Sequence, residues 1–167
     1  METVLVTGGT GFIGGWCIVE LLRRGYAVRT SIRDPSRDAA VRSAIASAGV
    51  PTDRLTSVRA DLTSDAGWDA AVAGCDYVLH IASPLGRNAT RDAQDLIVPA
   101  RDGTIRVLRA ATNAGVRRVV MTSAAAAARP AQGSDRIADE TDWTDTTELR
   151  LIPTGSPRCL PSAPPGI

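Results

Sequence analysis

The sequence contains no lysine, and all of its basic side chains are arginines. No lysine is therefore available for catalysis. His80 is the only histidine, and the three cysteines (Cys17, Cys75 and Cys159) are scattered along the chain. They do not recur at the short spacings of a metal site, so the sequence predicts no metal centre. Cys17 falls on the apolar face of a predicted helix and is interpreted as a small buried hydrophobic residue.

An excess of one charge and long apolar runs are also missing. Nineteen basic residues oppose 18 acidic ones, which gives a formal net charge of +1. This balance predicts neither a nucleic-acid surface nor a membrane surface. The sequence shows no signal peptide and no apolar span long enough to cross a bilayer, so we expect a cytoplasmic protein. The length of 167 residues suits one domain with a single core.

The most informative stretch is residues 4–22, which read VLVTGGTGFIGGWCIVELL. An apolar, β-rich run ends in a glycine cluster, and an amphipathic helical pattern begins at once. This order of strand, turn and helix is what a dinucleotide pyrophosphate needs. Gly8 permits a tight turn, Gly11 lets the backbone approach the phosphates, and Gly14 lets the helix pack close to the sheet. The alternative is a glycine-rich turn that binds nothing, at a cost in stability.

Strands and helices alternate along the chain. Strands are predicted at residues 4–7, 27–33, 55–59, 77–82 and 118–122. Helices are predicted at residues 12–24, 37–48, 65–73 and 92–114. Residues 77–82, YVLHIA, form a continuous apolar run that is typical of a parallel strand buried on both faces. Alternation turns His80 toward the sheet interior, where we interpret it as structural. The pattern predicts an α/β fold with a doubly wound parallel sheet.

Residues 7–14, TGGTGFIG, space their glycines differently from the GxGxxG pattern of ordinary dehydrogenases. They resemble the extended short-chain dehydrogenase/reductase family, of the NAD-dependent epimerase/dehydratase type, in its dihydroflavonol-reductase-like branch. The resemblance reaches about residue 145 and implies a Rossmann-type NAD(P)-binding domain at residues 1–150, incomplete at its C-terminal side, because family members are about twice as long. The motif residues implied to hold the cofactor are Thr7, Gly8, Gly11, Phe12, Ile13 and Gly14.

The end of the second predicted strand bears on the choice of cofactor. NAD enzymes place an acidic residue about 20 residues beyond the glycine turn. Residues 32–35 read IRDP here, which resembles NADP-dependent members of the family. We therefore expect Arg33 to grip the 2′-phosphate of NADP, with Arg37 as a second contact. In the alternative, Arg33 is structural and Asp34 contacts the ribose, which favours NAD.

Two later segments also resemble cofactor-binding parts of the family. Asp61 and Leu62 stand where the family uses an Asp-Leu pair on the adenine edge, although Asp61 as a helix N-cap is a near-equal alternative. Residues 78–84, VLHIASP, resemble the strand whose end lies against the cofactor. This resemblance makes Ala82 and Ser83 candidate cofactor contacts.

Residues 118–124, RVVMTSA, resemble the strand that delivers the family's catalytic serine. The family commonly reads Thr-Ser-Ser, and the second serine polarises the substrate carbonyl. That position is Ala124 here, so Ser123 is the candidate catalytic hydroxyl and Thr122 is its alternative. In a truncated protein this apolar strand, residues 118–122, would be an unpaired edge where the next strand should dock, so we expect it to be prone to self-association.

The larger departure is the missing Tyr-x-x-x-Lys, in which the lysine lowers the pKa of the acid/base tyrosine. The only tyrosines are Tyr26 and Tyr77, so the sequence as written has no catalytic acid/base. Residues 151–167 are rich in Pro, Ser and Gly and are expected to be disordered. Residues 153–167, read from the third base of each codon, can encode Tyr-x-x-Ser-Lys-x-x-Ala-Glu-Arg-Ala-Ala-Trp. We therefore hypothesise a frameshift at or before Leu151 and a truncated protein.

The resemblance implies an NADP-dependent oxidoreductase that transfers a hydride between the nicotinamide and a secondary alcohol or ketone. It also implies a small-molecule carbonyl or alcohol substrate, and an oligomer is possible. Two alternatives belong to other classes: a catalytically silent NAD(P)-binding module and a non-functional gene fragment. Cofactor titration separates the gene fragment from the other two, and turnover separates the enzyme from the silent module.

Overall fold

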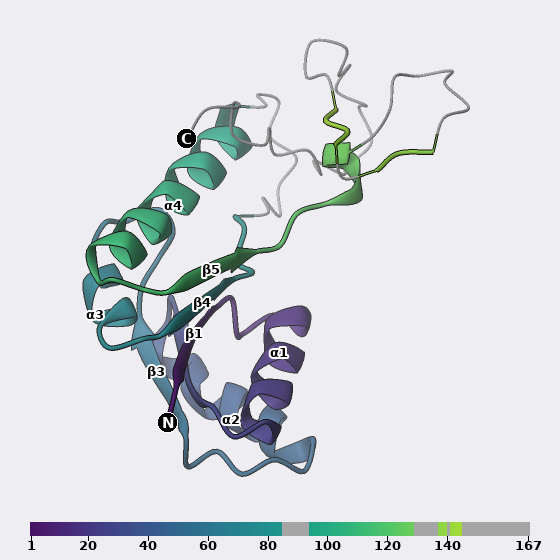
Figure 1. The fold of residues 1–167 in the computed structure, drawn as a ribbon. Coiled ribbons are helices and arrows are strands. Elements are labelled where there is room, and N and C mark those ends of the chain that lie inside the picture. Colours follow the sequence, from purple (N-terminus) through teal and green to yellow (C-terminus); the bar gives the residue numbers. More distant parts are fainter. Residues whose placement is uncertain (85–93, 129–136, 140, 145–167) are drawn as a thin grey trace. The chain divides into compact units, whose positions relative to one another are not determined.

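The computed structural model describes residues 1–84, 94–128, 137–139 and 141–144 (Figure 1). The chain divides into two compact units. One comprises Met1–Pro84 and Asp102–Thr122, and the other comprises Leu85–Arg101 and Ser123–Ile167. The segment predicted to be a disordered, out-of-frame tail (residues 151–167) lies outside the described residues, as does Glu140.

The first unit is built on a five-stranded sheet. Its strands are β1 (Thr3–Thr7), β2 (Ala27–Ile32), β3 (Leu55–Arg59), β4 (Tyr77–His80) and β5 (Arg118–Met121). All neighbours pair in parallel, in the order β3-β2-β1-β4-β5. The chain starts at β1, moves outward to β3 and returns past β1 to β4 and β5. The prediction of a doubly wound parallel sheet is confirmed.

In the described part of the chain, α-helices connect the successive strands of the sheet, and one 3-10 helix follows its last strand (Figure 1). The helices are α1 (Phe12–Arg23), α2 (Asp38–Ser47), α3 (Trp68–Val72), α4 (Gln94–Asn113), η1 (Pro35–Arg37) and η2 (Ala125–Ala128). Helix α3 starts three residues later than predicted. Gly67 precedes it at φ +91°, and a Cβ there would lie 2.2 Å from the Arg59 carbonyl oxygen. The expected start of α4 at residue 92 lies outside the described residues.

The sheet separates two apolar cores, as the period-two alternation of strand side chains requires. On one side Val4 and Val6 of β1 pack with residues of α1 and α2 such as Ile18 and Ile45. On the other side Leu5 of β1 packs with residues of α3 and α4, among them Val72, Val107 and Ala111. Helices of the first unit therefore bury both faces of the central strand.

Two burial predictions need correction. Cys17 is half-buried at the margin of the α1–α2 core rather than fully buried. Strand β4 is shorter than the predicted residues 77–82 and is not fully buried on both faces. Val78 and His80 are buried, whereas Tyr77 and Leu79 are half-buried against the α1–α2 core.

Strand β5 lies at the edge of the described sheet. Among the described residues it pairs with β4 alone. Val120 and Met121 are 52% and 50% exposed. The predicted apolar edge is therefore present in the described part of the chain.

Candidate functional site

The glycine turn, residues 8–11, connects the end of β1 to the start of α1. Gly8 has φ +78°, and a Cβ there would lie 3.1 Å from the backbone N and Cα of Ala82. A Cβ on Gly14 would lie 2.2 Å from the Gly8 carbonyl oxygen, which no side chain tolerates. The Gly11 amide donates to the same oxygen at 2.9 Å. The turn therefore folds back on itself and brings β1, α1 and the end of β4 within backbone contact.

The position of the turn in the sheet also favours a ligand. The chain leaves β1 toward β2 on one side and β4 lies on the other, so β1 and β4 flank the point where strand order reverses. Open α/β sheets bind ligands at the carboxyl ends of such strands. Several predicted site residues lie at the carboxyl ends of the strands, because each ends or follows a parallel strand: Thr7, Gly8, Arg33, Asp61 and Ala82.

Helix α1 presents its first turn without a side-chain cap. Gly11 is the N-cap and no acidic residue lies in the first turn. The free N–H groups and the helix dipole therefore favour an anion here. Phe12 and Ile13, at the head of the helix, are 82% and 58% exposed.

The sequence interpretation missed Gly9, which follows Gly8 in the turn. A Cβ on Gly9 would lie 2.2 Å from Thr30 Oγ1 and 2.7 Å from Ile18 Cδ1. Only a glycine therefore lets the turn settle onto β2 and α1. The doubled glycine in TGGTG was the available signal.

The end of β4 is held against the turn by a side chain of β1. Thr7 Oγ1 accepts hydrogen bonds from the amides of Ile81 and Ala82, both at 3.0 Å. These amides turn toward the Thr7 hydroxyl, and β4 therefore ends at His80. Ala82 lies beside Gly8, and exposed Ser83 follows it.

His80 is buried behind this contact, with 1% of its surface exposed. Its Nδ1 lies 2.8 Å from Thr7 Oγ1, and its Nε2 lies 3.3 Å from Thr104 Oγ1 of α4. Burial lowers the pKa of His80 from 6.5 to about 4, so the imidazole is neutral near pH 7. Its placement agrees with the predicted structural role.

Arg33 and Arg37 follow β2 and are exposed. Neither guanidinium forms a hydrogen bond or ion pair with another residue in the described ranges. Asp34 between them is engaged, since its Oδ1 accepts from the Ser36 amide at 3.0 Å and caps η1. Hydrogen bonds from Ser36, with the nearby Arg37 and Arg59 charges, lower the pKa of Asp34.

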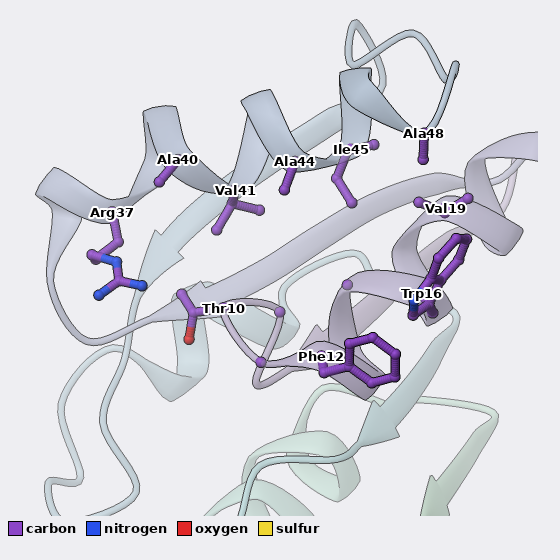
Figure 2. Close-up of a pocket in the computed structure, with 13 residues that line it drawn as sticks. Thr10, Phe12, Trp16, Val19, Arg37, Ala40, Val41, Ala44, Ile45 and Ala48 are labelled. Carbon is purple, nitrogen blue, oxygen red and sulfur yellow. The ribbon is translucent and has the colours of Figure 1, made fainter.

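A cavity of about 370 Å³ lies between the glycine turn, α1 and α2 (Figure 2). Arg37 and Thr10 lie toward one end and the rings of Phe12 and Trp16 toward the other. The α2 side is lined by Ala40, Val41, Ala44, Ile45 and Ala48. Thr10 is a polar lining residue that the motif interpretation did not single out. Its place inside the turn was the only signal for it.

Asp61 and Leu62 follow β3 by way of Ala60. Asp61 Oδ1 accepts from both the amide and the hydroxyl of Thr63, each at 2.9 Å. The N-cap interpretation of Asp61 is wrong, because α3 begins at Trp68 and its N-cap is Gly67. Leu62 places its side chain in the core on the α3–α4 side. Any contact of Leu62 with a cofactor would therefore fall to its backbone.

Ser123 is the predicted catalytic residue. Ser123 is exposed and belongs to the second unit. Its catalytic role therefore stays a prediction. The alternative, Thr122, is turned toward β4, since its amide donates to the His80 carbonyl at 3.1 Å.

Both tyrosines lie away from the glycine turn, at the amino-terminal ends of the strands, whereas the turn lies at the carboxyl ends. Tyr77 begins β4 opposite Val4, and its hydroxyl donates to Glu2 Oε1 at 3.1 Å. That hydrogen bond is the main cause of the raised pKa of Tyr77. Tyr26 directly precedes β2. Neither phenol is placed to act as an acid/base at the turn.

Two features of the described residues bear on other classes of function: their possible metal ligands and the apolar character of their helices. They contain no group of three or more His, Cys, Asp or Glu side chains able to hold a metal ion. None of the helices that the structure describes combines the length and the apolar character that a membrane span requires.

Comparison with known proteins places this geometry in a family. A model described as the NAD dependent epimerase/dehydratase family matches residues 4–151. A dihydroflavonol 4-reductase of Dianthus caryophyllus is 37% identical over 151 residues, which cover 90% of this chain and 42% of the relative. An anthocyanidin reductase ((2S)-flavan-3-ol-forming) of Vitis vinifera is 39% identical over 147 residues, which cover 86% of this chain and 43% of the relative.

Comparison with solved structures also finds an NADPH-binding protein of similar fold. Gre2 of Candida albicans, in complex with NADPH, superposes with a TM-score of 0.76 at 28% identity. The match covers 92% of this chain and 47% of that one. The chain thus spans less than half the length of each of these three relatives.

Proposed function

This chain belongs to the NAD dependent epimerase/dehydratase family, in its dihydroflavonol-reductase-like branch, and we propose that it forms the NADPH-binding part of an oxidoreductase. The observation that carries the proposal is the glycine turn. At Gly14 there is no room for a side chain, and Gly8 has a positive φ that residues with a side chain rarely adopt. The turn opens onto an uncapped helix N-terminus at the reversal of strand order. A pyrophosphate fits such a cradle because it accepts hydrogen bonds from backbone N–H groups.

The preference for NADP over NAD rests on the residues after β2. Arg33 and Arg37 offer two exposed guanidinium groups, whereas the carboxylate that could hold a ribose diol, Asp34, already caps η1. A 2′-phosphate is recognised by such planar, charged donors. The NADPH seen with the Candida albicans relative is consistent with this choice.

The substrate class follows from the family. We propose a small-molecule ketone or secondary alcohol, handled in the cytoplasm. The bound nicotinamide would supply or accept the hydride. In this chain the glycine turn would fix the pyrophosphate and Ala82 with Ser83 would border the cofactor. Ser123 is the proposed hydroxyl for the substrate carbonyl. Residues 1–150 would form this domain, and the out-of-frame origin of residues 151–167 remains a hypothesis.

A second function, a silent NADPH-binding module, is favoured by one observation. Reduction of a ketone needs a proton donor at the carbonyl, and the sequence has no lysine and no tyrosine beyond Tyr77. Tyr77 and Tyr26 lie at the amino-terminal ends of their strands, opposite the glycine turn at the carboxyl ends. The chain by itself would then bind the cofactor without turning it over.

Calorimetric titration of the purified chain with NADPH and with NADH tests the proposal. We expect both to bind, with NADPH the tighter. A folded chain that binds neither would contradict the proposed function. Tighter binding of NADH would contradict only the role of Arg33 and Arg37.

A further inference from the structure

We propose that Thr104 of α4 is a positioning residue for the glycine turn and acts through His80 and Thr7. Three side chains form a connected series of contacts: Thr104 of α4 meets His80 of β4, and His80 meets Thr7 at the end of β1. Thr7 in turn holds the backbone segment that faces Gly8. The inference rests on the proposed function only for what the turn binds.

The hydrogen-bond balance at Thr7 is the first step. Its hydroxyl oxygen lies within 3.0 Å of the Ile81 and Ala82 amides and 2.8 Å from His80 Nδ1. Amides can only donate, so they occupy the two acceptor sites of the hydroxyl. The single O–H proton of Thr7 is therefore directed to Nδ1, which must be unprotonated.

The tautomer of His80 is the second step. With Nδ1 accepting, the neutral imidazole carries its proton on Nε2. The hydroxyl oxygen of Thr104 lies 3.3 Å from Nε2 and accepts a hydrogen bond from its N–H group. Thr104 is thus the partner that makes this tautomer favourable in a site where an unpaired N–H is costly.

The third step links Thr104 to the turn. Without the Thr104 acceptor, the imidazole can move its proton to Nδ1, which then becomes a third donor to Thr7. Thr7 has only two acceptor sites, so the Ile81 or the Ala82 amide loses its partner. Ala82 is the residue whose backbone lies 3.1 Å from a Cβ built on Gly8. A loosened Ala82 would widen the wall of the turn.

Helix α4 is well placed to hold Thr104 steady. A Cβ on its neighbour Gly103 would lie 2.8 Å from Leu62 Cβ, so the helix backbone packs directly on the segment after β3. Arg106 Nη1 also donates to the Leu62 carbonyl at 2.9 Å. One turn of α4 therefore contacts both Leu62, which follows β3, and His80, the last residue of β4.

The test uses the full chain labelled with ¹⁵N. Because His80 is the only histidine, its two ring nitrogens give an unambiguous NMR signature of the tautomer. Thr104→Val keeps the shape and removes the acceptor, and Thr104→Ser keeps the hydroxyl. Thr112→Val is the matched control, since Thr112 lies on the same helix and its hydroxyl donates to the Leu108 carbonyl rather than to any side chain in the described structure.

We expect an Nε2–H imidazole in the unmodified chain. Thr104→Val should show Nδ1–H, roughly tenfold faster hydrogen exchange at Ile81 or Ala82, and several-fold weaker NADPH binding. Thr104→Ser and Thr112→Val should behave like the unmodified chain. The serine rescue and the tautomer signal are readouts that a general loss of packing would not produce.

Two results would overturn the positioning role: an Nδ1–H or charged imidazole in the unmodified chain at neutral pH, or an unchanged tautomer and unchanged exchange in Thr104→Val. Failure of the proposed function appears differently. A chain that shows the expected tautomer and exchange changes but binds no NADPH would support the contact chain and contradict the cofactor.

Discussion

Burial holds the His80 imidazole neutral, and this single side chain makes the stability of the fold depend on pH. Its pKa falls from 6.5 to about 4 on folding. Between those values the unfolded chain binds a proton that the folded chain does not, so stability decreases as pH falls through the window. The loss is at most about 3 kcal/mol. Urea unfolding at pH 7.5 and at pH 4.5 measures it.

His80→Asn is the control for this pH dependence, because an amide oxygen can accept from Thr7 but does not titrate. The variant should show a flat stability between pH 6.5 and 4.5. Carboxylates with lowered pKa values, such as Asp38 and Asp76, lose their contribution only as pH falls below about 4. A wild-type slope identical to that of His80→Asn would contradict the argument.

Arg33 carries the second prediction at the scale of the residue. Its exposed guanidinium has no ion-pair partner in the described ranges, so reversing its charge should remove the proposed phosphate contact without unfolding the chain. Arg33→Asp should weaken NADPH binding by about 1.5–3 kcal/mol and affect NADH little or improve it. Arg109→Asp, at another exposed arginine, is the matched control for titration. Equal loss for both cofactors would make Arg33 structural.

At the scale of the elements, one position of the glycine turn should accept a side chain without loss of folding but with loss of cofactor binding. Gly11 is the extended N-cap of α1, at φ −95°, and a Cβ there would meet only the Gly8 carbonyl oxygen, at 3.3 Å. Gly11→Val should therefore fold, while its branched side chain would fill the space proposed for the phosphates and should abolish binding. Isothermal titration, with circular dichroism to check folding, measures both.

Gly15→Ala is the control within the same helix. A Cβ on Gly15 would lie 4.0 Å from the Gly9 carbonyl oxygen, which is open contact. The substitution should leave NADPH binding unchanged and raise the free energy of unfolding by roughly 0.5–1 kcal/mol. Retained affinity in a folded Gly11→Val protein would refute the phosphate site.

The edge strand β5 gives a prediction about association. Val120 and Met121 are about half exposed on a strand that pairs on one side only in the described sheet. Because unpaired edges with apolar side chains recruit other strands, the chain should self-associate as concentration rises. Val120→Lys should reduce this in sedimentation experiments, and Leu108→Lys on α4 should not. Concentration-independent sedimentation of the unmodified chain would contradict it.

At the scale of the whole molecule, we expect the chain to retain cofactor binding while it lacks catalytic turnover. The 167-residue chain should bind NADPH but show no measurable ketone reduction, because no tyrosine or lysine is available at the turn to donate the proton. A gene whose frame is shifted at or before codon 151 should restore activity. NADPH consumption by both proteins, at matched cofactor occupancy, is the measurement. Comparable rates in both would require an acid/base elsewhere in the chain.

The order of the elements and the glycine turn were predictable from the sequence alone. The pattern of residues 4–22 and the alternation that follows it depend on local sterics and on the period of apolar side chains. Local sterics and apolar periodicity are properties of neighbouring residues, so predictions based on them do not require knowledge of the fold. The five strands and the parallel sheet followed, as did the burial of His80, and the termini of the elements shifted by only a few residues.

What only the tertiary structure decided are contacts between distant residues. Strand β4 ends at His80 because the hydroxyl of Thr7, more than 70 positions earlier, captures the next two amides. Gly9 is required by Thr30 and Ile18, and the N-cap interpretation of Asp61 failed because Gly67 starts α3. Hydrogen bonds and steric limits act within a few ångströms, so separation along the chain hides them until folding brings their partners together.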